Sequence, residues 1–394
     1  MCKISYNCMN ILHSLWFRVF IFLVFCLYLL FKGSSDNYDD ISEDLIIDKA
    51  LLGNSDEKKE LYIYTWDGYF PHEVVIAFEK ITGIKVHIDV FDSNELLEIK
   101  LISGKSHYDI VCPSLTPFFG RQMEIGLYQK LDKKLLNFYD DFDPFIIEKV
   151  IEVNDALDFA LPYFWGVSGF AVNEKRVKEI FPEADVNSLS LVFEEKNLQK
   201  ISKLNVTFLN SPSEVFPILA HYMFNGENGT DEQLKLMYEK LCKLRKYIFK
   251  FSQSATIDLF NGSSAVAFCT SGSVRQMLCE SESGDNDIRF VFPKEGAELW
   301  IDVLAIPKNA KHLKNAHMFF NYIFSPKVIA YISNRMACAN PIVKSKKYIK
   351  KDIVNDVNVY PSDEVLSKCF IEKINSIDYD RVRTKLFTKV KSCL

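Results

Sequence analysis

Short apolar segments alternate with amphipathic segments along most of the chain, and this alternation restricts the fold more than any other feature. The elements predicted in the first series are a strand at 61–66, a helix at 71–83, a strand at 84–91, a helix at 94–104 and a strand at 108–114. This βαβαβ order predicts a parallel sheet covered by helices, with ligands at the carboxyl ends of the strands. Trp66 and Ser114 end two of these strands, so we expect them at the ligand-binding edge.

A second α/β series follows the aromatic cluster at 162–166. Its predicted elements are a strand at 206–210, helices at 214–226 and 234–251, and strands at 265–269 and 289–293. Breaks in the pattern near 165 and near 300 predict two α/β lobes that are joined twice. The periodicity alone does not show that the chain crosses back between the lobes.

The first 60 residues differ from the rest of the chain. Residues 19–31 form an uncharged apolar run after Arg18, as in an export signal, and predict an exported, periplasmic protein. Residues 16–31 approach the length of about 20 residues that a membrane span needs, so cleavage and retention as an inner-membrane anchor both stay open. We therefore expect residues 1–35 to be a signal peptide or membrane anchor and the acidic residues 36–60 to be a linker.

The composition excludes several classes of function. A net charge of −5 over 394 residues provides no basic surplus for a nucleic-acid partner. The seven histidines are not paired in a metal-binding motif, and the sequence has no GxSxG, P-loop or GxGxxG motif. We therefore predict a protein that is not an enzyme and that has no cofactor or metal site.

Ten cysteines are scattered singly, without a CxxC motif. Four of them lie in apolar surroundings and are predicted to be small core residues: Cys112, Cys242, Cys269 and Cys338. Seven cysteines follow the predicted export segment, so a monomer has at least one that is unpaired.

Seven motifs occur in an order that resembles a known family. They are LYIYTWDGY (61–69), TGIKV (82–86), DSNE (92–95), YDIVCPS (108–114), LPYFWGVSGFAVN (161–173), FPKEGAELWIDVLAIPKNA (292–310) and VYPSDE (359–364). As an ordered series the chain resembles the spermidine/putrescine-binding proteins of bacterial ABC importers, over most of the sequence after the export segment.

The resemblance implies a two-lobed periplasmic-binding-protein (Venus-flytrap) fold, in which each lobe is a mostly parallel α/β sheet flanked by helices. The lobes would comprise 61–164 with 301–338, and 165–300 with 339–394, connected by hinge crossovers. The implied function is extracytoplasmic binding of polyamines (putrescine or spermidine) by a monomer, and their delivery to an ABC-type permease in the inner membrane through closure of the lobes.

A polyamine site needs carboxylates for the ammonium groups and aromatic faces for the alkyl chain. The resemblance assigns ring positions to Trp66, Tyr69, Phe268 and Trp300, and the main ammonium anchor to Asp302. On the strand LWIDV, side chains two apart share a face, which places Trp300 beside Asp302. The alternative for Asp302 is an ion pair with a lysine or a turn cap.

Three further residues are candidate ligand contacts, and each has a structural alternative: Asp67, Ser114 and Glu214. Asp67 is followed by Gly68 and could form a simple turn, and Ser114 could also belong to a turn. Ser211 and Glu214 have the spacing of a capping box, which would explain both without a ligand.

Some positions depart from the family pattern. Ser211 stands where relatives carry an acid, and Thr116 and Cys338 stand where many carry tyrosines, so the pocket is expected to be roomier or less aromatic. The altered pocket leaves open a binding protein of the same fold for another small organic cation or metabolite. An uncleaved N-terminal anchor would instead favour a second alternative, a membrane-tethered sensor or interaction protein without a transport role.

Overall fold

The structure is a computed structural model that describes residues 42–226, 229–280 and 287–393. Residues 47–394 form one compact unit. The predicted export segment, residues 1–35, lies outside the described residues. Within the described part of the chain, no helix combines the length and the apolar character that crossing a membrane requires.

The first predicted series forms as expected. Its elements are β1 (Glu60–Thr65), α2 (His72–Thr82), β2 (Lys85–Val90), α3 (Asn94–Ile102) and β3 (Ile110–Val111). Strand β1 pairs in parallel with both β2 and β3. Gly83 ends α2 at a φ of 72°, a left-handed conformation that glycine adopts without a steric cost. The Ser93 hydroxyl accepts a hydrogen bond from the Leu96 amide and so caps α3.

The second series matches the prediction except at one point. Its elements are β5 (Val206–Leu209), α10 (Pro212–Phe224), α11 (Asp231–Arg245), β6 (Lys250–Ser252), β7 (Val266–Thr270) and β8 (Ile288–Val291). The helix predicted at 234–251 ends at Arg245, and this part of the prediction is wrong. Lys250–Ser252 instead pairs in parallel with β5 at the sheet edge, so a tertiary contact overrides the helical pattern.

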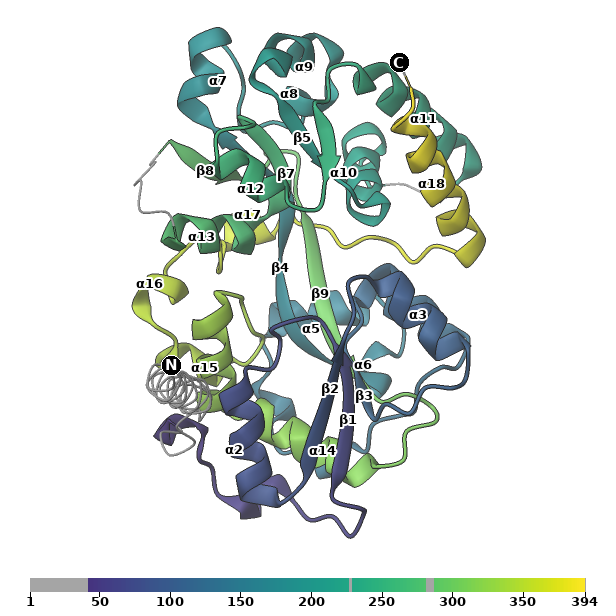
Figure 1. The fold of residues 1–394 in the computed structure, drawn as a ribbon, viewed down its shortest axis with the longest axis vertical. Coiled ribbons are helices and arrows are strands. Elements are labelled where there is room, and N and C mark those ends of the chain that lie inside the picture. Colours follow the sequence, from purple (N-terminus) through teal and green to yellow (C-terminus); the bar gives the residue numbers. More distant parts are fainter. Residues whose placement is uncertain (1–41, 227–228, 281–286, 394) are drawn as a thin grey trace, which may run out of the picture. The chain divides into compact units, whose positions relative to one another are not determined.

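Two long strands connect the two series (Figure 1). Strands β4 (Ala160–Asn173) and β9 (Glu298–Ala305) pair with each other in antiparallel orientation. They produce a single sheet with the order β2-β1-β3-β9-β4-β7-β5-β6, and β8 also pairs with β4. The chain therefore crosses between the two halves along β4 and β9, as the two-lobed fold requires. The lobe boundaries given above stay a prediction.

The remaining helices cover the faces of the sheet and the ends of the strands. They are α4 (Gly120–Glu124), α5 (Pro144–Ile151), α6 (Ala156–Phe159), α7 (Glu174–Ile180), α8 (Ser190–Phe193), α9 (Glu195–Ile201), α12 (Ala255–Phe260), α13 (Ser271–Glu280), α14 (Leu313–Ile323), α15 (Pro326–Met336), α16 (Lys351–Val354), α17 (Asp363–Leu366) and α18 (Ile377–Val390). A short 3-10 helix at Lys49–Leu52 packs on α14. The Glu57 carboxylate accepts hydrogen bonds from the first turn of α14, so this part of the predicted linker lies against the body.

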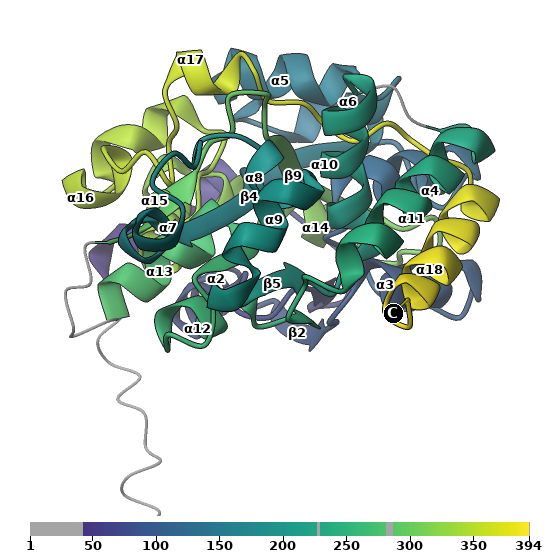
Figure 2. The ribbon, with the colours of Figure 1, turned by 90° about the horizontal axis from the view of Figure 1, so that it is seen from above.

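The C-terminal helix α18 lies beside α11 and α10 (Figure 2). A disulfide joins Cys242 of α11 to Cys393, which follows α18. The prediction that Cys242 is a small core residue is therefore wrong, because the residue is cross-linked and only partly buried. Cys112 and Cys269 are buried as free thiols, as predicted, whereas Cys338 is only partly buried.

A buried ion network joins the helices next to β1 and β3 to α18. Glu98 of α3 accepts two hydrogen bonds from Arg121 of α4, at 2.7 and 2.8 Å. Arg121 also pairs with Asp380 of α18, and Asp380 pairs with Arg383 at 2.8 Å. Arg383 in turn binds Glu372. All five side chains are buried, so this network holds the two halves of the molecule together in the described conformation.

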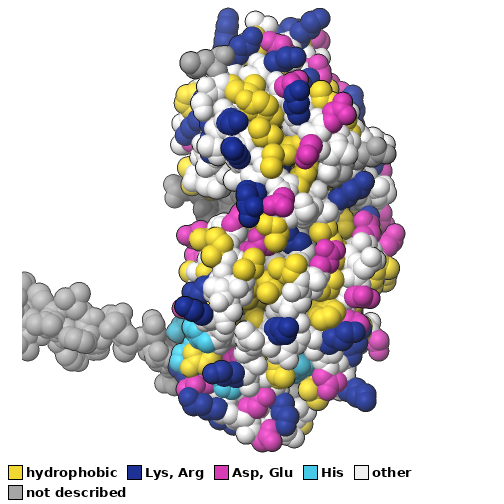
Figure 3. Space-filling view, turned by 90° about the vertical axis from the view of Figure 1, so that its right-hand side faces the viewer, with side chains coloured by type: hydrophobic (Ala, Val, Ile, Leu, Met, Phe, Trp, Pro, Cys, Tyr) yellow, Lys and Arg dark blue, Asp and Glu magenta, His cyan; other side chains and the backbone are white. Residues whose placement is uncertain are grey.

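The surface carries charges of both signs. On the face in Figure 3, lysine and arginine side chains are interspersed with aspartate and glutamate. This described face therefore has no extended basic stripe of the kind that binds a phosphate backbone.

The ion network generates a stability prediction. Replacing Arg383 by alanine would leave Glu372 as a buried acid without an ion-pair partner and Asp380 with Arg121 alone, which costs about 3–5 kcal/mol. We expect a loss of that order in the free energy of unfolding, measured by urea denaturation.

The matched control is Arg381→Ala on the same helix. Arg381 pairs with Asp378, and their side chains are 74% and 86% exposed. Exposed pairs contribute about 0–1 kcal/mol, so the control should remain close to the unaltered protein. Equal losses in the two variants would contradict the importance of the buried network.

Candidate functional site

A cavity of about 400 Å³ lies where β1, β3 and the start of α3 approach β4, β9 and the starts of α10 and α13. Its size is typical of small-molecule sites. Six of the residues predicted from the sequence line it: Trp66, Tyr69, Ser114, Glu214, Trp300 and Asp302. The edge that the βαβαβ order predicts is therefore the edge where the cavity forms.

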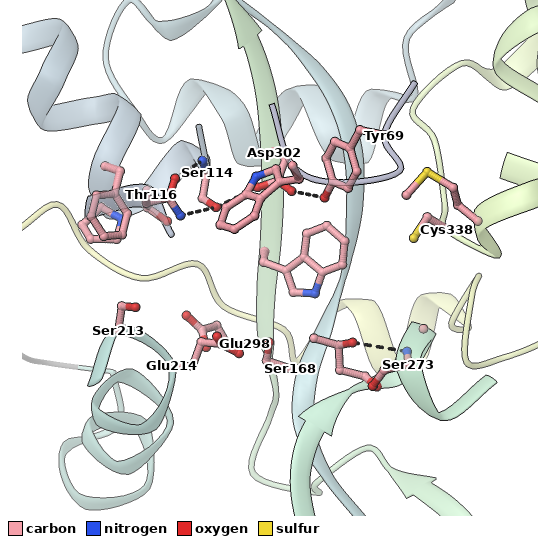
Figure 4. Close-up of a pocket in the computed structure, with 18 of the residues that line it drawn as sticks. Tyr69, Ser114, Thr116, Ser168, Ser213, Glu214, Ser273, Glu298, Asp302 and Cys338 are labelled. Carbon is pink, nitrogen blue, oxygen red and sulfur yellow. Dashed lines mark hydrogen bonds between the residues drawn. The ribbon is translucent and has the colours of Figure 1, made fainter. Parts of the chain in front are cut away.

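Asp302 lies on β9 inside the cavity and is only 4% exposed. The Tyr69 hydroxyl donates a hydrogen bond to one carboxylate oxygen, and the Ser114 hydroxyl donates to the other at 2.7 Å (Figure 4). The ion pair with a lysine, which was the alternative role for this residue, is absent from the described structure.

Both donors are fixed by neighbouring groups. The Asn94 side chain accepts from the Ser114 amide and donates to the Ser114 hydroxyl, each at 3.0 Å. The Tyr163 hydroxyl donates to the Tyr69 carbonyl at 2.9 Å. The carboxylate of Asp302 is thus held in one orientation before any ligand arrives.

Burial sets the ionisation of Asp302. It raises the pKa of this carboxyl from 3.8 to about 6, although the hydroxyl donors Tyr69 and Ser114 act in the opposite direction. A cation bound beside the carboxylate would favour the charged form and lower the pKa again. A bound cation would therefore hold Asp302 in its charged form and neutralise that charge.

Trp300 lies beside Asp302 on β9 and faces Gly166 on β4. A Cβ atom at position 166 would be only 2.5 Å from Cζ2 of the Trp300 ring. The absence of a side chain at 166 therefore lets the indole lie against β4 while it lines the cavity. Trp66 is held in a different way, by an edge-to-face contact with Phe91 at 4.5 Å between ring centroids.

Glu214 lies in the first turn of α10 and lines the cavity. The predicted capping box is wrong. Ser211 is the N-cap residue and Pro212 follows it, but the Ser211 side chain makes no capping hydrogen bond. Burial raises the pKa of Glu214 from 4.5 to about 7, with the hydroxyls of Ser211 and Ser168 lowering it and the charge of Asp302 raising it.

Two predicted residues do not line the cavity. Asp67 is exposed in the turn after β1. Phe268 is buried in the core against Phe208, with ring centroids 4.5 Å apart. Thr270 and Ser273, at the end of β7 and the start of α13, occupy the lining instead.

Sequence reasoning missed Glu298, which starts β9 and lines the cavity. The signal was available, because the period of two that pairs Trp300 with Asp302 also places Glu298 on the same face. Thr116 and Cys338, the positions that depart from the family pattern, are part of the lining as well.

The lining is strongly asymmetric in charge. It includes three carboxylates, Asp302, Glu214 and Glu298, and no lysine, arginine or histidine among the described residues. Buried charges are normally paired, so a cavity lined in this way suits a cationic guest. The described residues contain no group of three or more side chains arranged to hold a metal ion.

Comparison with known proteins identifies the family. Residues 62–330 match the family of bacterial extracellular solute-binding proteins. The chain belongs to that family. The putrescine-binding periplasmic protein PotF of Escherichia coli (strain K12) is 38% identical over 342 residues, which cover 85% of this chain and 92% of PotF. The putrescine-binding periplasmic protein SpuD of Pseudomonas aeruginosa (strain UCBPP-PA14) is 36% identical, covering 87% of this chain and 95% of SpuD.

The fold has solved counterparts. The spermidine/putrescine ABC transporter substrate-binding protein PotD of Streptococcus pneumoniae superimposes with a TM-score of 0.70 at 23% identity, covering 85% of this chain and 99% of that one. The two-lobed fold predicted from the sequence is thereby confirmed. As a member of its family the chain is an exported solute-binding protein and not an enzyme.

The raised pKa of Asp302 generates a prediction for the empty protein. Because the folded state binds this proton more tightly than the unfolded chain, stability falls as the pH rises from about 4 through about 6. Asp302→Asn removes this loss of stability, because asparagine has no carboxyl group to ionise. We expect the variant to be more stable than the unaltered protein at pH 8 by on the order of 1–3 kcal/mol, and equally stable at pH 4.

Urea unfolding at both pH values measures this difference. Asp378→Asn, at an 86% exposed position, serves as the control and should show no gain at pH 8. An Asp302→Asn protein that is less stable than the unaltered protein at pH 8 would contradict the account.

Proposed function

We propose that this protein binds a linear polyamine, putrescine or spermidine, in the cavity and delivers it to an ABC-type permease in the inner membrane. The observation that carries the proposal is the buried Asp302 carboxylate beside Trp300, in a lining that has acidic but no basic side chains among its described residues. The names of the relatives PotF, SpuD and PotD support the same ligand class.

The proposed arrangement uses each wall of the cavity. One ammonium group binds Asp302, the methylene chain lies along the indoles of Trp66 and Trp300, and a second ammonium group binds Glu214. A hydrogen bond to a charged group contributes about 1.5–3 kcal/mol. A cation–π contact adds about 0.5–2 kcal/mol, depending on how far the site excludes water.

Lobe closure follows because the proposed ligand contacts come from both halves of the molecule. Trp66 and Ser114 belong to the strand ends of the first series, whereas Glu214 belongs to the second, and Asp302 lies on the connecting strand β9. A ligand that contacts both halves favours the closed state by its difference in affinity between the open and closed states. The permease would recognise the closed, loaded form.

The finer localisation is also a proposal. Residues 16–31 direct export, and in molecules that keep this segment it anchors the protein to the inner membrane. We also propose that the protein docks on the permease as a monomer.

Calorimetric titration tests the ligand class. We expect putrescine or spermidine to bind, and neither 1,4-butanediol, which has no charge, nor ornithine, whose carboxylate would be repelled by the lining, to bind comparably. Asp302→Asn should weaken amine binding by roughly 10- to 150-fold, the equivalent of one charge-assisted hydrogen bond.

Asp378→Asn is the matched control, because it removes an aspartate charge from an exposed position on α18. Its affinity should equal that of the unaltered protein. Absence of any amine-dependent heat in ligand-free protein would refute the proposal. Native mass spectrometry that finds a co-purified molecule of another class would do the same.

Amine affinity should also depend on pH. The pKa values of Asp302 and Glu214 in the empty protein are about 6 and about 7, so both carboxyls carry protons at pH 5 that a cation must displace. We expect the affinity for putrescine to fall between pH 8 and pH 5 by on the order of 10²–10³. Titrations at constant ionic strength measure this slope, and an affinity that is constant over the range would show that these carboxyls do not contact the ligand.

A further inference from the structure

Glu298 is a buried acid of the cavity lining that the proposed binding arrangement does not use. It is the first residue of β9, lies on the same strand face as Trp300 and Asp302, and is only 6% exposed. It lines the cavity, and its Oε2 atom has no hydrogen-bond partner in the described structure. A buried carboxylate oxygen without a partner is costly, which points to a partner that arrives from outside.

The nearby ion network does not supply that partner. Arg383 lies close enough to lower the pKa of Glu298, but its own ion pairs are with Glu372 and Asp380. The network contains three carboxylates and two guanidinium groups, so it is already net negative. No positive charge in it is left over to neutralise Glu298.

Glu298 instead lies close to Glu214, which binds the second ammonium group in the proposed arrangement. Figure 4 shows the side chains of Glu298 and Glu214 side by side, in the part of the cavity away from Asp302. Burial raises the pKa of Glu298 well above its usual value, and the charges of Glu372 and Glu214 raise it further. The charge of Asp302 in turn raises the pKa of Glu214, so Glu214 lies within electrostatic range of both Glu298 and Asp302.

We propose that Glu298 is a ligand-binding residue that forms a third ammonium subsite beside Glu214, and that the cavity therefore prefers a linear triamine over a diamine. This inference rests on the proposed function and extends it to ligand choice. A diamine pairs with Asp302 and Glu214 and leaves Glu298 neutral. A triamine supplies a positive charge for each of the three carboxylates, and Glu298 gives up its proton to bind the third.

Binding of the triamine should thus release more protons than binding of the diamine. For unaltered protein at pH 7, titrations in buffers with different ionisation enthalpies give the number of protons released. We expect spermidine to release more protons than putrescine. Equal proton release for the two amines would overturn the inference without any variant.

Glu298→Gln is the direct test, with Glu364→Gln as control because Glu364 is 83% exposed. We expect Glu298→Gln to reduce the ratio of spermidine to putrescine affinity by tenfold or more and to abolish the difference in proton release. The control should change neither quantity. Glu298→Asp keeps the charge on a shorter side chain and should retain the difference in proton release.

The outcomes distinguish a failure of the Glu298 subsite from a failure of the proposed function. An unchanged affinity ratio in Glu298→Gln, or an equal loss for both amines, would show that Glu298 has only a structural role and leave the proposed function intact. If the unaltered protein binds neither amine, the proposed function fails. Should Glu298→Gln not fold, the proton release of the unaltered protein and of Glu298→Asp decides the question.

Discussion

The hydrogen bonds that Tyr69 and Ser114 donate to Asp302 are the contacts on which the site depends. They connect residues more than 180 positions apart in the sequence and bring the ends of β1 and β3 to the crossing strand β9. They also keep the carboxylate in a fixed orientation in a place where water is largely excluded. A charge held in this way costs free energy in the empty protein and favours a cation that can neutralise it.

That cost is part of the function. Asp302, Glu214 and Glu298 all have raised pKa values because of burial, so the empty cavity keeps protons that a bound cation would replace. Ligand binding and lobe closure are then coupled, since the contacts from both halves exist together only around the guest. The buried network around Arg121 and Arg383 joins the same two halves outside the cavity lining and acts through charges that are already paired.

The sequence predicts much of this arrangement for identifiable reasons. The βαβαβ order located Trp66 and Ser114 at a ligand-binding edge, and the strand period of two located Trp300 beside Asp302; the structure places all four in the cavity lining. The same period of two also places Glu298 on the strand face of Trp300 and Asp302. These predictions succeed because they depend only on local backbone geometry.

Other features depend on tertiary contacts that no local pattern contains. Phe268 and Thr270 are two apart on β7 and share a strand face, so alternation does not show that Phe268 lies in the core while Thr270 lines the cavity. The spacing of Ser211 and Glu214 is that of a capping box, but the Glu214 side chain lines the cavity. The strand β6 and the disulfide of Cys242 likewise follow from pairing with distant residues.

A crystal structure of the protein grown with putrescine would show whether the amine binds at Asp302. We expect an ammonium nitrogen within hydrogen-bonding distance of the Asp302 carboxylate, with the methylene chain against the Trp300 ring. Putrescine bound elsewhere, or a cavity in which Asp302 contacts only Tyr69 and Ser114 when the amine is bound, would contradict it.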